Sequence, residues 1–238
     1  MENNMAMEYP MFCYQCEQTA GGKGCTKMGV CGKTPEIAAL QDLLIYQIKG
    51  ISCYAKEIVE KGENVDKSIV TFIENSLFTT LTNVNFDADF HVEMLKESQR
   101  IKEKVRKQVG KIKNATYNLS ETKSEMLEDA KKAGIMYDQK LDPDIRSLRQ
   151  TIIYGLKGIS AYGHQARELG YYDDQVDNFY IRALEATTDD TLSVEELIRW
   201  TMRTGDMSVA VMKKLDEANT TVYDNPSPHK VNVHIKKG

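Results

Sequence analysis

The sequence lacks long hydrophobic runs and lacks a strong charge of either sign. No apolar stretch approaches the roughly 20 residues that a membrane-spanning helix needs, so a membrane protein is not expected. The formal net charge is −4, and the 31 basic and 35 acidic side chains are well mixed along the chain. This balance argues against nucleic acid or an anionic membrane surface as a partner.

The first residues have none of the marks of a secretory leader. Residues 1–10 carry Glu2 and Glu8 without a basic head or an apolar stretch, and we interpret them as a flexible extension. A cytoplasmic location is therefore expected, where thiols are kept reduced. The chain has 5 cysteines, an odd number for a disulfide framework. Metal binding or redox chemistry is thus the favoured use of the cysteines.

What the chain does contain is an internal repeat. Residues 34–57 align without a gap on residues 142–165, at an offset of 108, with 10 identities in 24 positions. The identities include Gly50 with Gly158 and Lys49 with Lys157. Such similarity indicates two copies of one supersecondary unit. A glycine repeated at the same point inside a helix suggests the close approach of another helix.

Each copy begins with a helix-start signal. Thr34 and Asp142 are good N-caps, and the proline after each suits the first helical position. Apolar residues then recur at helical spacing. Two further helices are predicted in each copy, at residues 65–81 and 89–112 and at residues 173–186 and 193–217. The predicted fold class is all-α, with two tandem three-helix bundles over residues 34–112 and 142–218.

Two segments fall outside the predicted bundles. Residues 113–141 form a polar connector, with a short helix predicted near 124–133. Residues 219–238 are predicted to be an extended tail, because Val231, Val233 and Ile235 alternate with polar side chains as in a strand. A lone strand has no partner in a helical chain. We therefore expect the tail to lead to an α/β domain that is missing from this sequence.

The chemistry of the chain is concentrated in a cysteine loop, residues 11–33. Its four cysteines follow the pattern C-x2-C-x8-C-x5-C and are Cys13, Cys16, Cys25 and Cys31. Thiolates bind iron and zinc alike, but the second pair is more widely spaced than in a usual zinc knuckle. An iron–sulfur cluster is therefore preferred, structural zinc is the less favoured alternative, and free thiols or disulfides are the least favoured.

The other residues of the loop point the same way. Five glycines would let backbone N–H groups approach cluster sulfurs closely, and they are Gly21, Gly22, Gly24, Gly29 and Gly32. Lys23, Lys27 and Lys33 are expected to place positive charge around a site of net negative charge.

Several other conspicuous residues are assigned structural roles. Cys53 stands alone in a helix and is interpreted as a small buried hydrophobic residue. The repeated tyrosine pairs Tyr46/Tyr154 and Tyr54/Tyr162 are interpreted as packing residues. The charge runs 102–113 and 121–132 are interpreted as solvated helix faces.

The segment from Met11 to Thr19, M-F-C-Y-Q-C-E-Q-T, is followed by Cys25, Cys31 and G-K-T-P-E, and it closely resembles the N-terminus of the hybrid cluster proteins. These are also called prismane proteins or hydroxylamine reductases. The resemblance continues through Y-Q-I-K-G-I-S and Y-G-L-K-G-I-S and covers essentially residues 11–238.

The resemblance implies an N-terminal domain of two three-helix bundles that holds an ordinary iron–sulfur cluster. At this short spacing the cluster is expected to be [4Fe–4S], bound by Cys13, Cys16, Cys25 and Cys31. It also implies a second, hybrid iron–sulfur–oxygen cluster, where hydroxylamine is reduced to ammonia. The ligands of that cluster belong to later domains, so no catalytic residue is expected in this chain.

The leading hypothesis is an electron-transfer module of a hydroxylamine-reducing oxidoreductase. The module would take electrons from an external donor and pass them to the remaining domains of the same polypeptide, and the truncated chain alone is not expected to turn over substrate. One alternative is a structural or docking domain, for instance at a homodimer interface, with the cysteines as a fold-stabilising metal clip. Another is a substrate other than hydroxylamine, such as nitric oxide or a peroxide.

Overall fold

The computed structural model describes residues 11–110, 112, 119–137 and 140–233, so the expectations for residues 1–10, for residues 113–118 of the connector and for Ile235 fall outside the described residues. Within these ranges the chain forms α-helices and no strand, which confirms the all-α prediction. The helices are α1 (Pro35–Glu60), α2 (Lys67–Thr79), α3 (Ala88–Val109), α4 (Lys123–Ala130), α5 (Pro143–Glu168), α6 (Asp174–Ala186) and α7 (Val194–Tyr223).

The predicted helix starts are confirmed because their signals are local. Thr34 Oγ1 accepts a hydrogen bond from the N–H of Ile37 at the start of α1. Asp142 does the same for two N–H groups at the start of α5. Each cap satisfies donors that the first turn of a helix leaves without a partner. Both copies of the repeat therefore begin alike.

The end of α7 differs from its prediction. The helix continues to Tyr223 rather than ending near residue 217, and the predicted tail begins correspondingly later. Val231 and Val233 lie in an exposed segment without regular structure, so the strand predicted there is not formed over the described residues. A strand needs a neighbouring strand to pair its backbone groups, and the described chain supplies none.

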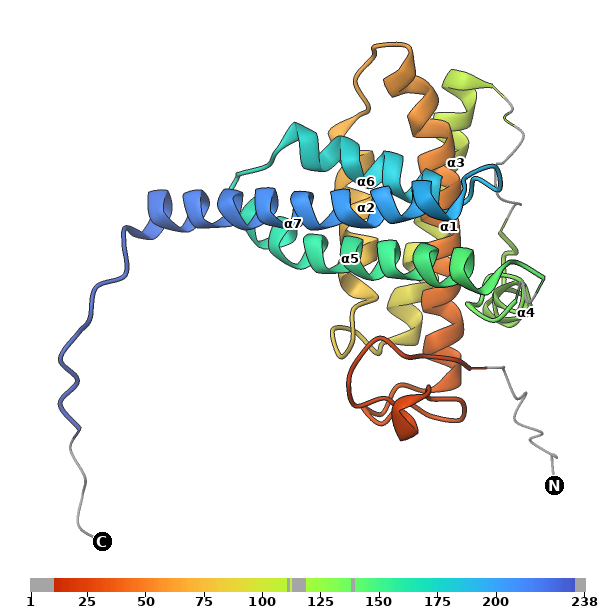
Figure 1. The fold of residues 1–238 in the computed structure, drawn as a ribbon, viewed down its shortest axis with the longest axis horizontal. Coiled ribbons are helices and arrows are strands. Elements are labelled where there is room, and N and C mark those ends of the chain that lie inside the picture. Colours follow the sequence, from red (N-terminus) through yellow and green to blue (C-terminus); the bar gives the residue numbers. More distant parts are fainter. Residues whose placement is uncertain (1–10, 111, 113–118, 138–139, 234–238) are drawn as a thin grey trace, which may run out of the picture.

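The two copies of the repeat pack into one another. The first helix of each copy, α1 or α5, packs against the last helix of its own copy, α3 or α7. Each also packs against the middle helix of the other copy, so that α1 contacts α6 and α5 contacts α2. In Figure 1, α1 and α3 run upright and α5, α6 and α7 run across them. A single buried apolar cluster therefore contains residues from both copies.

Of the two repeated glycines expected to allow close approach of another helix, Gly158 does not do so. A Cβ atom at Gly158 would meet nothing within 4 Å. Closer contacts occur at Gly155, where a Cβ would overlap the methyl group of Thr204 in α7, and at Gly163, where it would overlap the Glu74 carboxylate in α2. These two glycines have no glycine partner in the first copy.

Two further structural interpretations from the sequence are only partly right. Tyr54 is buried as expected, but its repeat partner Tyr162 is 43% exposed. Lys102, in a run expected to be solvated, is buried, and its Nζ donates to Gln47 Oε1 at 2.7 Å. Cys53 is buried, as predicted.

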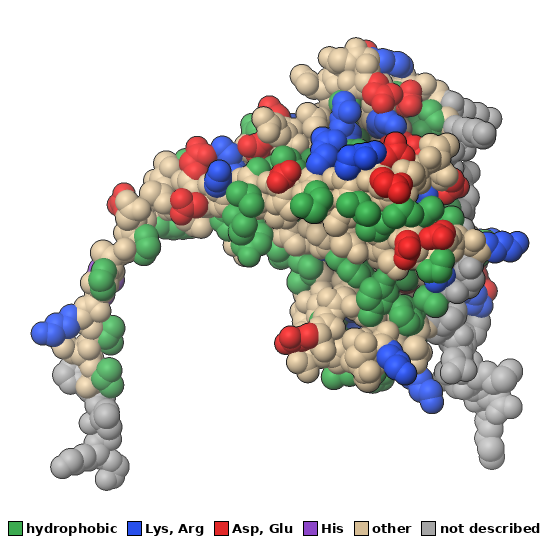
Figure 2. Space-filling model, viewed as in Figure 1, with side chains coloured by type: hydrophobic (Ala, Val, Ile, Leu, Met, Phe, Trp, Pro, Cys, Tyr) green, Lys and Arg blue, Asp and Glu red, His purple; other side chains and the backbone are tan. Residues whose placement is uncertain are grey.

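The surface of α7 carries an exposed apolar stripe. Its members include Ile198, Met202, Val209 and Met212, and Figure 2 shows hydrophobic side chains along this helix. None of the helices in the described ranges combines the length and the apolar character that a membrane span requires.

Candidate functional site: the cysteine loop

The cysteine loop lies at the N-terminal end of α1 (Figure 1) and is organised by a backbone pair between Cys13 and Cys25. The N–H of each donates to the carbonyl oxygen of the other, at 3.0 and 2.8 Å. In an antiparallel pair of this kind the two side chains project to the same side. Two of the four predicted ligands, one from each half of the motif, are thus held side by side.

The sulfur of Cys25 is buried and surrounded by hydrogen-bond donors. The N–H of Ala20 donates to Sγ at 3.4 Å, and Thr19 Oγ1 lies 3.8 Å from it. Hydrogen bonds from the N–H groups of Ala20 and Val30 lower the pKa of the Cys25 thiol against the opposing effect of burial. Donors of this kind stabilise the thiolate, which is the form that binds a metal.

Two glycines of the loop are required by close contacts. Gly24 has φ +153°, and a Cβ there would come 2.6 Å from the ring of Phe12. A Cβ at Gly29 would come 3.0 Å from the Cys31 sulfur. The N–H of Gly29 donates to the carbonyl oxygen of Lys33 at 2.8 Å, so the expected approach of glycine N–H groups to cluster sulfurs stays a prediction.

The remaining geometry does not form a finished metal site. Cys16 and Cys31 are half-buried, and all the cysteine thiols are free. In the part of the chain that the structure describes, no three Cys, His, Asp or Glu side chains converge closely enough to hold one ion. The donor set itself, four thiols with backbone N–H groups directed at one sulfur, fits an iron–sulfur cluster. The assignment of the four ligands stays a prediction.

The positive charge of the loop is arranged differently from the expectation. Lys23 and Lys27 are exposed, whereas Lys33 is buried beneath the loop. Its Nζ donates to Gln41 Oε1 of α1 at 2.5 Å, and Gln41 Nε2 lies 3.4 Å from His91 Nε2 of α3. Lys33 therefore links the end of the loop to α1 directly and to α3 through Gln41. Its positive charge lies in the protein interior and not at the surface of the loop.

A second buried lysine, Lys157 of α5, meets the other end of the loop. Its Nζ donates to Gln15 Oε1 at 3.2 Å and to the carbonyl oxygen of Thr80 at 3.1 Å. Burial lowers the pKa of Lys157 and raises that of nearby Asp42, while the attraction between the two opposes both shifts. The loop thus rests on an interior group of charged side chains.

Sequence reasoning missed this polar support. Gln15 lies inside the motif between Cys13 and Cys16, and Lys157 is the repeat partner of Lys49. The identity of the two lysines was the one available signal, since a lysine repeated inside an apolar helix face calls for a buried acceptor. Asp42 aligns with Gln150, so the repeat gave no signal of a buried acid at this position.

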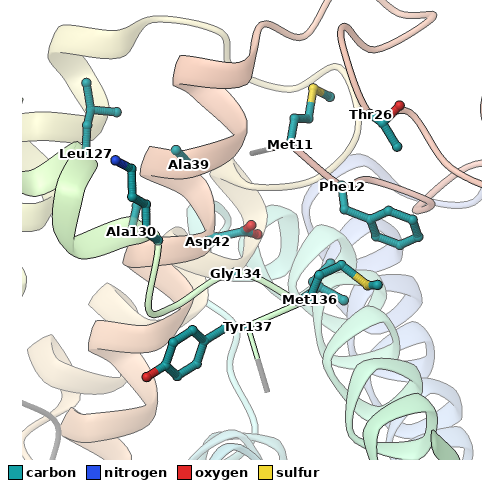
Figure 3. Close-up of a pocket in the computed structure, with 12 residues that line it drawn as sticks. Met11, Phe12, Thr26, Ala39, Asp42, Leu127, Ala130, Gly134, Met136 and Tyr137 are labelled. Carbon is teal, nitrogen blue, oxygen red and sulfur yellow. The ribbon is translucent and has the colours of Figure 1, made fainter. Parts of the chain in front are cut away.

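An apolar pocket of about 310 Å³ opens beside the loop. Figure 3 shows Met11 and Phe12 of the loop on one side of the pocket and Tyr137 on another. Asp42 supplies the carboxylate among its described lining residues. The pocket lies between the loop, α1 and the segment around α4.

Comparison with known proteins identifies the family. The profile of the Prismane/CO dehydrogenase family matches residues 11–238. The chain is 42% identical to a hydroxylamine reductase of Acetivibrio thermocellus over 233 residues, covering 95% of this chain and 42% of that protein. It is also 42% identical to the hydroxylamine reductases of Syntrophobacter fumaroxidans and Desulfovibrio desulfuricans, covering 96% of this chain in each case.

The chain spans less than half of each relative, at 42% of the Desulfovibrio protein and 43% of the Syntrophobacter protein. The match includes the cysteine loop and both copies of the repeat, and it confirms the resemblance seen in the sequence. The chain therefore belongs to the Prismane/CO dehydrogenase family.

Proposed function

We propose that this chain is the N-terminal electron-transfer part of a cytoplasmic oxidoreductase that reduces hydroxylamine to ammonia. The Prismane family implies iron–sulfur cofactors in general, and the relatives that cover this chain are named hydroxylamine reductases. Because the chain spans less than half of those relatives, substrate turnover is assigned to the whole protein.

The observation that carries the proposal is the Cys13–Cys25 pair, with backbone N–H groups directed at the Cys25 sulfur. We assign a [4Fe–4S] cluster to Cys13, Cys16, Cys25 and Cys31. When bound, such a cluster supplies one-electron transfer. The N–H of Ala20 stabilises negative charge on its ligand sulfur.

The buried lysines then have a role in electron uptake. Lys33 and Lys157 lie beneath the loop in a region of low dielectric, where a lysine in its protonated form stabilises added negative charge more than it would in water. Electrons would arrive from an external donor and leave to a hybrid cluster held by the remaining domains of the polypeptide. No residue of this chain is assigned a catalytic role.

Iron and labile-sulfide analysis tests the cofactor. After anaerobic preparation we expect about four irons and about four sulfides per chain, and a visible absorption that bleaches on reduction. Replacing Cys25 with serine removes a ligand and should lower the iron content sharply, whereas Cys53→Ser, a buried cysteine outside the loop, should leave it unchanged. Stoichiometric zinc without visible absorption would refute the proposal.

A second candidate, the fold-stabilising clip, has one observation in its favour. Met11, Cys25 and Ala38 form a small apolar cluster that joins the loop to α1. If the bound metal served mainly to fix the cysteine loop to α1, loss of the metal would unfold the helices.

A further inference from the structure

A cavity lined by positive side chains adjoins the apolar pocket, with which it shares Gly134, Ile135 and Tyr137. It measures about 390 Å³ and is enclosed by α1, the segment after α4, α5 and the turn after α6. Its cationic lining residues are Lys49, Lys132, Arg146 and Arg149, against one carboxylate among its described lining residues, Asp190. Lys132 and Arg146 make interactions of their own, so Lys49 and Arg149 are the cations that matter for the cavity.

That single carboxylate is already engaged. Arg149 Nη2 donates to Asp190 Oδ1 at 2.9 Å and to the carbonyl oxygen of Asp189 at 2.8 Å. The Asp190 side chain is 79% exposed, so water weakens what it contributes to the cavity. The Nε of Arg149 is buried and has no hydrogen-bond partner. A buried guanidinium N–H without an acceptor is costly and calls for one.

Lys49 is a second cation in the lining of this cavity. Its side chain is half-buried and makes no hydrogen bond or ion pair with another described residue. Burial, reinforced by the charge of Arg149, lowers the pKa of Lys49 to about 8, with Asp42 opposing the shift in part. Two crowded cations in one cavity are stabilised by a shared anion.

Another cavity of the same size provides the contrast. It measures about 380 Å³ and lies between α2 and α3, with Arg100 and Lys104 in its lining. There each cation has its own carboxylate, Glu97 at 2.7 Å and Asp66 at 2.9 Å. Cationic side chains in a cavity are thus not unusual in this chain. The cavity between α1 and α5 differs because Arg149 Nε and Lys49 Nζ have no acceptor among the described residues.

We propose that the cavity between α1 and α5 binds a small oxyanion, with Arg149 Nε and Lys49 Nζ as its principal donors. A tetrahedral or carboxylate oxyanion offers several acceptor oxygens and can bridge a guanidinium and an ammonium group at once. A narrow polar cavity that shares Tyr46, Lys49 and Gln150 with this one extends to Gln15 and Lys157 beneath the cysteine loop. The anion site is therefore separate from the cysteine loop but lies next to its polar support.

Titration of the 238-residue chain with inorganic phosphate tests the site. In a chloride buffer of low ionic strength, calorimetry should detect one phosphate per chain, and sulfate should compete for it. Lys49→Met removes one of the two charge-assisted donors and should weaken binding about tenfold or more. Lys104→Met, in the contrasting cavity, removes a cation of the same kind and should leave phosphate binding unchanged.

A measurement on the unaltered chain keeps the test independent of how the variants fold. Amide NMR shifts on adding phosphate should be confined to the surroundings of Lys49, Arg149, Thr187 and Thr188. Absence of saturable binding would overturn the proposal, and so would shifts centred elsewhere. Equal weakening by Lys49→Met and Lys104→Met would show general charge attraction instead of a site.

Discussion

At the scale of single residues, the centre of the molecule depends on a glycine that makes room for a buried ion network. Arg167 Nε donates to Glu74 Oε2 at 2.5 Å and Arg167 Nη2 donates to Asp177 Oδ1 at 2.6 Å. Glu74 is fully buried, and the absence of a side chain at Gly163 leaves space for its carboxylate. The contact joins α5 of one copy to α2 of the other.

Gly163→Ala should therefore destabilise the fold although alanine is the better helix former. The added Cβ overlaps Glu74 Oε1, and inserting a methyl group into a filled interior costs roughly 1–3 kcal/mol. Gly158→Ala, in the same helix, meets nothing within 4 Å and should raise stability by about 0.5–1 kcal/mol. Chemical denaturation measures both, and equal stability of the two variants would contradict this account.

These two glycines also show what the sequence could reveal. The identity of Gly50 and Gly158 suggested a helix contact, but no such contact is made at Gly158. Gly163 aligns with Ala55, so the repeat did not predict the close contact that is found there. Sequence identity between the two copies shows which residues they share. It does not show which helix packs against α5 at a given residue, and the contacts of α5 depend on that. Burial of Lys102 was missed for the same reason, because its acceptor, Gln47, comes from another helix.

At the scale of elements, helix starts were predictable and helix partners were not. The caps of α1 and α5 are set by residues adjacent in sequence. The packing of α1 on α6 and of α5 on α2 is a long-range arrangement that local pattern does not encode. The cysteine motif and its loop could likewise be identified from sequence, while its lysine support required the positions of α1 and α5.

The contact of α2 with α5 should make stability depend on pH. Burial raises the pKa of Glu74 from 4.5 to about 6, against the opposing attraction of Arg167, while the Asp177 carboxylate acts in the same direction as burial. The folded chain therefore binds a proton more readily than the unfolded chain between these values. The contribution of Glu74 to the unfolding free energy should then fall as pH rises from about 4.5 to about 6.

Glu74→Gln removes this titration and should flatten that part of the stability profile. Its absolute stability also changes, because the ion pair with Arg167 is lost, so the slope and not the level is the readout. Asp177 shares Arg167 and also has a raised pKa, and it should leave a smaller slope at lower pH. Denaturation midpoints measured across pH 4 to 7 test this, and an unchanged slope would contradict the assignment.

At the scale of the whole molecule, the helical body and the cysteine loop are held by separate apolar contacts. One buried cluster spans helices of both copies and contains no residue of the loop. The loop meets α1 through the small cluster of Met11, Cys25 and Ala38. The stability of the helical body should therefore be largely independent of what the cysteines bind.

Removal of the proposed cluster by anaerobic chelation should expose this independence. The loop should become open to trypsin at Lys23 and Lys27, which are already exposed, because protein backbone that loses local contacts is cleaved first. The far-UV circular dichroism of the helices should stay the same, since their shared core is untouched. The apo form of a Cys25→Ser variant serves as the control, with its loop cleaved before any chelator is added. Loss of helical signal together with the iron would instead make the cysteine loop a fold-stabilising clip and remove the reason to assign it to electron transfer.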